Sequence, residues 1–105
     1  MPEQIAFRMN LNLGEAEEYE RRHNNVFPDL AQALSQAGVS DYSIWFDPET
    51  HHLFGILTRT ENHTMDALPD TEVMKRWWAH MADVMETDAN NVPVQIPLKR
   101  VFYLP

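Results

Sequence analysis

The sequence predicts an α+β domain whose elements follow the order β-α-β-β-α-β. Four segments are predicted as strands, two of them from the alternation of their side chains between two faces, at residues 5–11, 39–47, 51–58 and 98–104. Apolar residues recur at helical spacing along residues 13–34 and 73–85. This order is that of the ferredoxin-like plan, in which an antiparallel sheet carries its helices on one face.

The first helix is predicted to follow the first strand directly. It extends over residues 14–37, with Gly38 as its stop. Pro28 lies inside this segment and lacks the amide hydrogen that would bond to the carbonyl oxygen of Asn24. A kink or a break is therefore expected one turn after the middle of the helix.

The two central strands are predicted to pair as a hairpin. Residues 47–50, Asp-Pro-Glu-Thr, form the turn between them, with proline at its first central position. In the second of these strands Gly55 allows the close approach of a backbone or a ring.

Two helical segments and a loop are predicted before the last strand. Thr60 begins a short helix that ends near Leu68, and Asp70 or Thr71 caps a longer helix that ends near Met85. A polar loop bounded by prolines, residues 86–97, then leads to the fourth strand. The sheet of this plan has an uncovered face, and two copies could stack those faces into a closed, dimeric α/β barrel.

Composition excludes several classes of function. A chain of 105 residues predicts one domain, residues 1–105. Its formal net charge of −8 argues against binding to nucleic acid or to an anionic membrane surface. The chain has no cysteine, which excludes disulfides, thiolate metal sites and cysteine nucleophiles. It shows no signal peptide and no apolar run of membrane-spanning length, so a soluble, cytoplasmic protein is expected.

No sequence motif indicates a metal or a cofactor. His51 and His52 are neighbours in a predicted strand and would face opposite ways, and no H-E-x-x-H motif occurs. The three glycines are scattered, so there is no phosphate-binding loop, and there is no G-x-S-x-G nucleophile motif. Proton transfer without a cofactor, or binding without chemistry, remains.

His23 is the candidate for such proton transfer. Tyr19, His23 and Phe27 are spaced by four residues, so they lie on the side of the first helix that faces the core. One interpretation is a core histidine that bonds a backbone carbonyl. The other is a histidine in a pocket, where an unperturbed pKa of ~6.5 suits proton transfer near neutral pH.

Four aromatic residues are candidates for ligand contact. Trp77 and Trp78 point about 100° apart on the second long helix, so one can pack in the core while the other lines a wall. An indole stacks well on the apolar face of a sugar ring or under a cation. Tyr19 and Tyr42 add hydroxyls to otherwise apolar surfaces, although a half-buried tyrosine often bonds only a backbone partner.

Five motifs together resemble the L-rhamnose mutarotase family across nearly the whole chain. They are Glu18-Tyr19-Glu20-Arg21-Arg22-His23-Asn24, Tyr42-Ser43-Ile44, Arg76-Trp77-Trp78, Asp83-Val84-Met85 and Val101-Phe102-Tyr103-Leu104-Pro105. The sequence departs from the family pattern at two positions. Asn25 stands where a proline is frequent, and Phe27 stands where a tryptophan is frequent.

The resemblance implies a cytoplasmic homodimer that interconverts the α and β anomers of L-rhamnose without a cofactor. In that family the histidine of the R-R-H-N motif is the proton donor, which corresponds to His23. The tyrosines and tryptophans that contact the sugar correspond to Tyr19, Tyr42, Trp77 and Trp78. On this hypothesis His23 protonates the ring oxygen and takes the proton back on ring closure, whereas the group that accepts the C1 hydroxyl proton is not identified.

Two other functions fit the same fold, because function depends on the pocket and not on the fold. One is a small-ligand-binding dimer in which His23 is dispensable. The other is a cofactor-free monooxygenase that acts on an aromatic or quinone substrate. This second reading accounts for the tryptophans but less well for the tyrosine hydroxyls.

Overall fold

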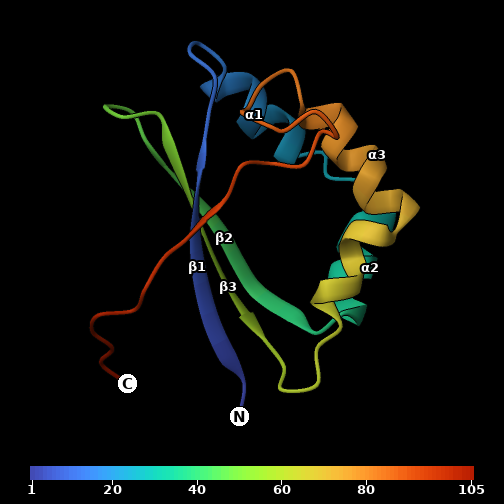
Figure 1. Ribbon diagram of the computed structural model, residues 1–105, viewed down its shortest axis with the longest axis vertical. Helices are drawn as coiled ribbons and strands as arrows, with labels where there is room; N and C mark the ends of the chain where they lie inside the picture. Colours follow the sequence, from blue (N-terminus) through green and yellow to red (C-terminus); the bar gives the residue numbers. More distant parts are fainter.

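The structure, a computed structural model, describes residues 1–105, and its elements follow the predicted order (Figure 1). Their bounds are Glu3–Asn10 for β1, Ala16–His23 for α1, Pro28–Gln36 for α2, Val39–Asp47 for β2, His52–Arg59 for β3, Met65–Asp70 for the 3-10 helix η1, Glu72–Met81 for α3 and Ile96–Pro97 for β4. The predicted β-α-β-β-α-β plan is therefore confirmed, with its first helix in two parts.

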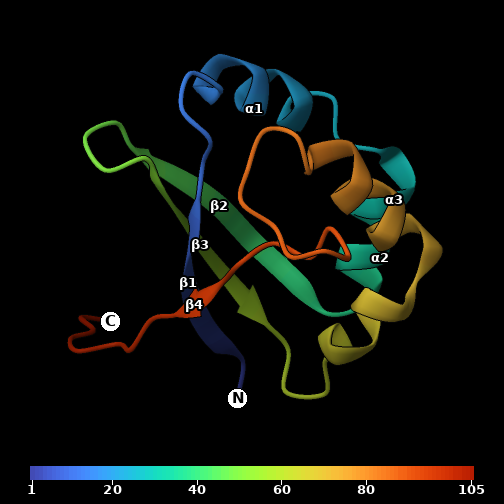
Figure 2. The ribbon, with the colours of Figure 1, turned by 45° about the horizontal axis from the view of Figure 1, so that its top comes forward.

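The four strands form one antiparallel sheet in the order β2-β3-β1-β4. β1 and β3 pair along their whole lengths, from Glu3 opposite Arg59 to Asn10 opposite His52. The helices lie on one side of this sheet, and the C-terminal segment runs away from them (Figures 1 and 2). This is the ferredoxin-like α+β arrangement that the sequence predicts.

Pro28 breaks the predicted first helix in two. α1 ends at His23, and α2 begins at Pro28, in the first helical position where a missing amide hydrogen costs nothing. Phe27, the residue before the proline, is extended, with φ −57° and ψ 127°. The break therefore places His23 in the last turn of a short helix, beside an irregular connection.

The second helical region differs from its prediction at both ends. Residues 60–64 are not helical, because the amides of Thr60 and Thr64 bond to the carbonyl oxygens of Gly38 and Ala37. Thr71 is the N-cap of α3, and its side chain accepts a hydrogen bond from the Met74 amide.

The predicted extension of α3 to Met85 is wrong, because the helix ends at Met81. The carbonyl oxygen of Val84 accepts a hydrogen bond from the Asn12 amide, and Met85 forms a bridge with Leu11. These contacts with the end of β1 replace the last helical turn. Val84 and Met85 remain apolar and buried, which is why their spacing still matched a helix.

The predicted strand over residues 98–104 is also wrong. The last strand is only Ile96–Pro97, and it pairs with β1 through Arg8 opposite Ile96. Pro97 has no amide to donate, and the Leu98 amide makes one further bond to the Ala6 carbonyl oxygen before the chain leaves the sheet. The first residue of the predicted β3, His51, likewise lies outside it, in a left-handed turn conformation with φ 64°.

The hydrophobic core joins the helix-facing side of the sheet to the helices. Twelve buried side chains form it, namely Phe7, Met9, Leu11, Tyr19, Leu30, Val39, Leu53, Leu57, Trp77, Met81, Val84 and Met85. Gly55 permits a close approach, as its position in the sequence suggests. A Cβ atom at this position would lie 2.5 Å from the Phe7 ring, so only glycine leaves room for the outer end of that ring.

Candidate active site

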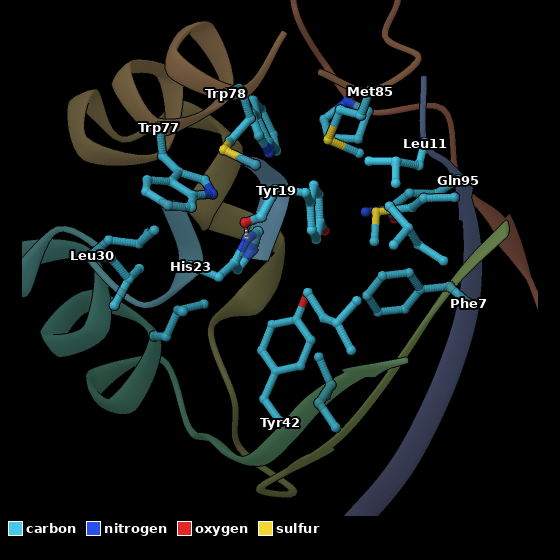
Figure 3. Close-up of a pocket in the computed structure, with 18 of the residues that line it drawn as sticks. Phe7, Leu11, Tyr19, His23, Leu30, Tyr42, Trp77, Trp78, Met85 and Gln95 are labelled. Atoms are coloured by element: carbon cyan, nitrogen blue, oxygen red, sulfur yellow. Dashed lines mark hydrogen bonds between the residues drawn. The ribbon is translucent and has the colours of Figure 1, made fainter. Parts of the chain in front are cut away.

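A cavity of about 830 Å³ lies between the helix-facing side of the sheet and the helices. Most of the residues that line it are hydrophobic. The structure places all five residues that sequence reasoning singled out in its wall, and they come from the three elements α1, β2 and α3: Tyr19, His23, Tyr42, Trp77 and Trp78 (Figure 3). A mostly apolar cleft with a few converging polar groups is the usual form of a small-molecule site.

His23 has one ring nitrogen occupied and one available. Its Nδ1 lies 3.0 Å from the carbonyl oxygen of Tyr19, one turn earlier in α1. Because a carbonyl oxygen only accepts hydrogen bonds, Nδ1 carries the hydrogen of this bond. In the neutral imidazole, Nε2 is therefore the unprotonated nitrogen and can accept a proton from a ligand.

Burial lowers the pKa of His23 below its ordinary value of 6.5, and the bond to the Tyr19 carbonyl only partly opposes this effect. The imidazole lies between two other rings, with centroid distances of 4.3 Å to Tyr19 and 5.3 Å to Trp77. At neutral pH the side chain is thus mainly a neutral base, held in place by aromatic contacts and by a backbone bond.

The two tyrosines remain protonated at physiological pH. Burial is the main cause that raises the pKa of Tyr19, and Tyr42 adds to the effect. Burial also raises the pKa of Tyr42 to about 12. Tyr42 comes from β2, so its phenol faces α1 from across the cavity (Figure 3). Both phenols can therefore donate and accept hydrogen bonds, but neither is a base.

The two tryptophans occupy different positions on α3. Trp77 is buried, and its ring meets the rings of His23 and Phe27 edge to face. Trp78 is half-buried and lies nearer Met85 (Figure 3). Both indoles line the cavity, so neither is only a core residue.

Four polar residues of the cavity wall escaped sequence reasoning: Glu17, Glu20, Asn24 and Gln95. Helical spacing could have found Glu17, Glu20 and Asn24, since they follow one another at intervals of three and four residues along α1 and its C-cap. No local signal marks Gln95, which reaches the wall from the irregular segment before β4.

No three His, Cys, Asp or Glu side chains come together as a metal site would require. None of the helices has the length and the hydropathy to span a membrane.

Comparison with known proteins identifies the family. The model of the family described as L-rhamnose mutarotase matches residues 4–104. The chain belongs to the L-rhamnose mutarotase family. An L-rhamnose mutarotase from Sinorhizobium fredii is 60% identical over 102 residues, which cover 97% of this chain and 98% of that protein. The L-rhamnose mutarotase of Paraburkholderia phytofirmans is 58% identical, with 97% and 95% covered.

One solved structure agrees with this membership, and a second shares only the fold. The crystal structure of an L-rhamnose mutarotase from Formosa agariphila superposes with a TM-score of 0.91 at 42% identity, and it covers 98% of this chain and 99% of that one. Protein PA3566 of Pseudomonas aeruginosa shares the fold at a TM-score of 0.60 and 18% identity, with 96% and 95% covered. The family predicted from the five motifs, and the isomerase class that it carries, are confirmed.

Proposed function

We propose that this chain interconverts the α and β anomers of L-rhamnose in the cavity that contains His23. The observation that carries the proposal is the free Nε2 of a mainly neutral imidazole in a cleft of phenols and indoles. The close relatives named L-rhamnose mutarotase support the choice of sugar. The cytoplasmic location stays a prediction from the sequence.

Anomer exchange requires two proton transfers at oxygens that share one carbon atom. The C1 hydroxyl loses its proton, the ring oxygen gains one, and the bond between C1 and the ring oxygen breaks to give an aldehyde and a C5 hydroxyl. Rotation about the C1–C2 bond and reversal of these steps give the other anomer. No proton is gained or lost overall, so one group that accepts and returns a proton is sufficient.

His23 can serve both transfers as a relay. Its neutral Nε2 accepts the proton of the C1 hydroxyl, and the resulting imidazolium donates it to the ring oxygen, which makes His23 the proton donor for ring opening. The Tyr19 carbonyl keeps Nδ1–H in place throughout. This relay also supplies the acceptor for the C1 hydroxyl proton that the sequence does not identify.

The aromatic residues bind and orient the sugar. The protonated phenols of Tyr19 and Tyr42 donate hydrogen bonds to ring hydroxyls without competing as bases. Trp77 and Trp78 provide flat apolar surfaces for the C–H faces of the ring. Fixing the pyranose against the imidazole supplies the orientation on which proton transfer depends.

Saturation-transfer NMR on L-rhamnose tests the proposal directly. Saturating one anomeric proton should reduce the signal of the other at catalytic protein concentrations, more strongly than for L-fucose or D-mannose. Sugar binding without transfer would favour the small-ligand-binding alternative. No effect on sugars together with oxygen uptake on a polyphenol would favour the monooxygenase. Either result would overturn the proposal.

The relay predicts a specific pH dependence. Because the neutral imidazole starts the reaction, kcat/KM should be constant at neutral and alkaline pH. It should fall about tenfold per unit below the pKa of His23, with a midpoint under 6.5. Glu18 and Asp83, whose pKa values arginine neighbours hold below 4.5 and 3.8, stay ionised across this window.

The profile can be measured by anomer-exchange NMR in parallel with a titration of the His23 ring proton signal. The two midpoints should coincide, because L-rhamnose itself does not ionise in this range. If kcat/KM instead falls as the pH rises through that midpoint, the imidazolium is the starting form and the relay is wrong.

We also propose that a second copy of the chain covers the outer face of the sheet, the face away from the helices. One row of side chains crosses it, in which Trp45 is opposite Phe54, Phe54 is opposite Arg8, and Arg8 is opposite Ile96. Trp45 is 65% exposed, and the Nε of Arg8 is buried without a hydrogen-bond partner. Exposed apolar side chains beside a buried donor without a partner are typical of a surface that another protein covers. We expect that surface to supply a hydrogen-bond acceptor to Arg8.

The apolar C-terminal segment supports the same conclusion, since Val101, Phe102, Tyr103 and Leu104 are all exposed. In analytical ultracentrifugation the protein should sediment as a dimer, and Trp45→Asp should shift it toward the monomer. Leu13→Asp introduces the same charge at another exposed apolar residue and should leave the dimer intact. A monomeric wild-type protein would disprove this part of the proposal.

A further inference from the structure

We propose that Arg22 is a positioning residue that fixes the helix bearing His23 against the helix bearing the two tryptophans. The inference rests on the proposed function of the cavity. Arg22 does not line the cavity, and it acts through the neighbouring residue. Its guanidinium instead connects α1 to the end of α3.

Arg22 forms four side-chain hydrogen bonds, and three of them make this connection. Within α1, Arg22 Nε donates to Glu18 Oε2 at 2.7 Å. Across to α3 and the turn that follows it, Nη1 donates to the His80 carbonyl oxygen at 2.7 Å and to Asp83 Oδ1 at 2.6 Å, and Nη2 donates to Asp83 Oδ2 at 3.2 Å. The fork of the guanidinium thus holds a carboxylate with two nitrogens and also bonds a carbonyl oxygen in the last turn of α3.

α1 needs an external restraint of this kind. It has only eight residues, and its N-terminus has no side-chain cap, since Glu15 at the N-cap forms no capping bond. A helix of this length is marginal without tertiary contacts. Tyr19 is its only buried residue, so one apolar anchor and the Arg22 contacts determine how the helix sits on the fold.

The connection lies next to the atoms that the reaction needs. Arg22 is adjacent to His23 in the sequence, and its acceptor His80 lies one turn after Trp77. The Trp77 ring in turn packs edge to face against the His23 ring, with 5.3 Å between the two ring centroids. A shift of α1 relative to α3 would therefore move the imidazole away from the indole that packs against it, and a displacement of about 1 Å can cost roughly 10²-fold in rate.

The contacts constrain geometry more than they stabilise the fold. The Asp83 side chain is 69% exposed, and ion pairs with an exposed partner contribute little to the free energy of unfolding. A lysine could supply the charge of Arg22 but not its fork, which reaches the carboxylate and the carbonyl oxygen together. Loss of Arg22 should therefore reduce turnover more than it reduces stability.

Arg21 provides a matched control. It is also an arginine bonded to Glu18, but it is exposed and forms no bond to α3. In anomer-exchange NMR, Arg22→Ala should lower kcat about 10- to 100-fold with a smaller change in KM, whereas Arg21→Ala should retain the wild-type kcat. Arg22→Lys should fall between the wild type and Arg22→Ala.

The pKa of His23 gives a readout that a merely structural role would not move. If Arg22→Ala releases α1, the imidazole gains water, and its pKa should rise toward 6.5. Arg21→Ala should leave that pKa at the wild-type value. Asp83→Ala removes both bonds from Arg22 to the carboxylate at an exposed position, and it should lower kcat even if Arg22→Ala folds poorly.

The outcomes separate this inference from the proposed function. If the wild-type protein shows no anomer exchange, the proposed function fails first. If the wild type exchanges anomers while Arg22→Ala and Asp83→Ala keep its kcat and its His23 pKa, the proposed function stands and Arg22 has no positioning role.

Discussion

Replacing His23 by alanine is expected to lower the catalysed rate of L-rhamnose anomer exchange by ~10²- to 10⁴-fold. The reason is that, of the five residues proposed to act on the sugar, only His23 carries a nitrogen that can accept a proton at neutral pH. The two phenols stay protonated at neutral pH, because burial raises their pKa values. The rate is measured by saturation transfer between the two anomeric protons, after subtraction of the uncatalysed exchange.

The fold should survive this substitution, because the imidazole is only half-buried and borders an existing cavity. His51→Asn is the matched control, since His51 lies outside the cavity and its φ of 64° suits asparagine. Added imidazole should partly restore exchange in the alanine variant. A folded His23→Ala protein that equilibrates the anomers at the wild-type rate would contradict the proposed mechanism.

Replacing Leu53 by alanine is expected to lower the free energy of unfolding by about 2–5 kcal/mol. Leu53 lies in the central strand β3, opposite Met9 on one side and Phe46 on the other, and it is 1% exposed. A domain of this size is stable by ~5–15 kcal/mol, so the loss is a large share of the total. Urea unfolding at one fixed protein concentration, with an unchanged slope, measures it.

Leu13→Ala makes the same chemical change at a side chain that is 79% exposed. It should alter the free energy of unfolding by no more than ~0.5 kcal/mol. If the two alanine variants unfold at the same urea concentration, Leu53 is not part of a packed core, and the position of the sheet behind the cavity is wrong.

Local pattern was sufficient for most of the secondary structure. The strand predicted at residues 39–47 is β2, Val39–Asp47, and the break expected at Pro28 separates α1 from α2. Both follow from short-range rules, the period of a half-buried strand and the missing amide of proline. The approach permitted by Gly55 was also predictable, although its partner, the Phe7 ring, was not.

The errors lie where distant segments compete for the same backbone groups. Apolar spacing continues beyond Met81, yet the bridge between Met85 and Leu11 ends the helix earlier. The apolar C-terminal residues resemble a strand, but Pro97 and the limited length of β1 leave only Ile96–Pro97 paired. Propensity cannot decide such cases, because the competing hydrogen bonds come from residues far away in the chain.

For the candidate site, too, the sequence identified the residues, whereas the structure was needed for their chemical state. Residue type and spacing selected Tyr19, His23, Tyr42, Trp77 and Trp78, and the structure places all five in one cavity. The tautomer of His23 and the direction of its pKa shift depend on a specific carbonyl and on burial. Neither can be read from the one-letter code.

By itself, the sequence determined the element order, the family and the aromatic and imidazole groups, because these follow from periodicity and from motifs that are each made of a few consecutive residues. Only the tertiary structure decided how α1 is held. The bonds from Arg22 to His80 and Asp83 join residues 58 and 61 positions apart. Such contacts form when packing brings two helices together, and local sequence carries no signal for them.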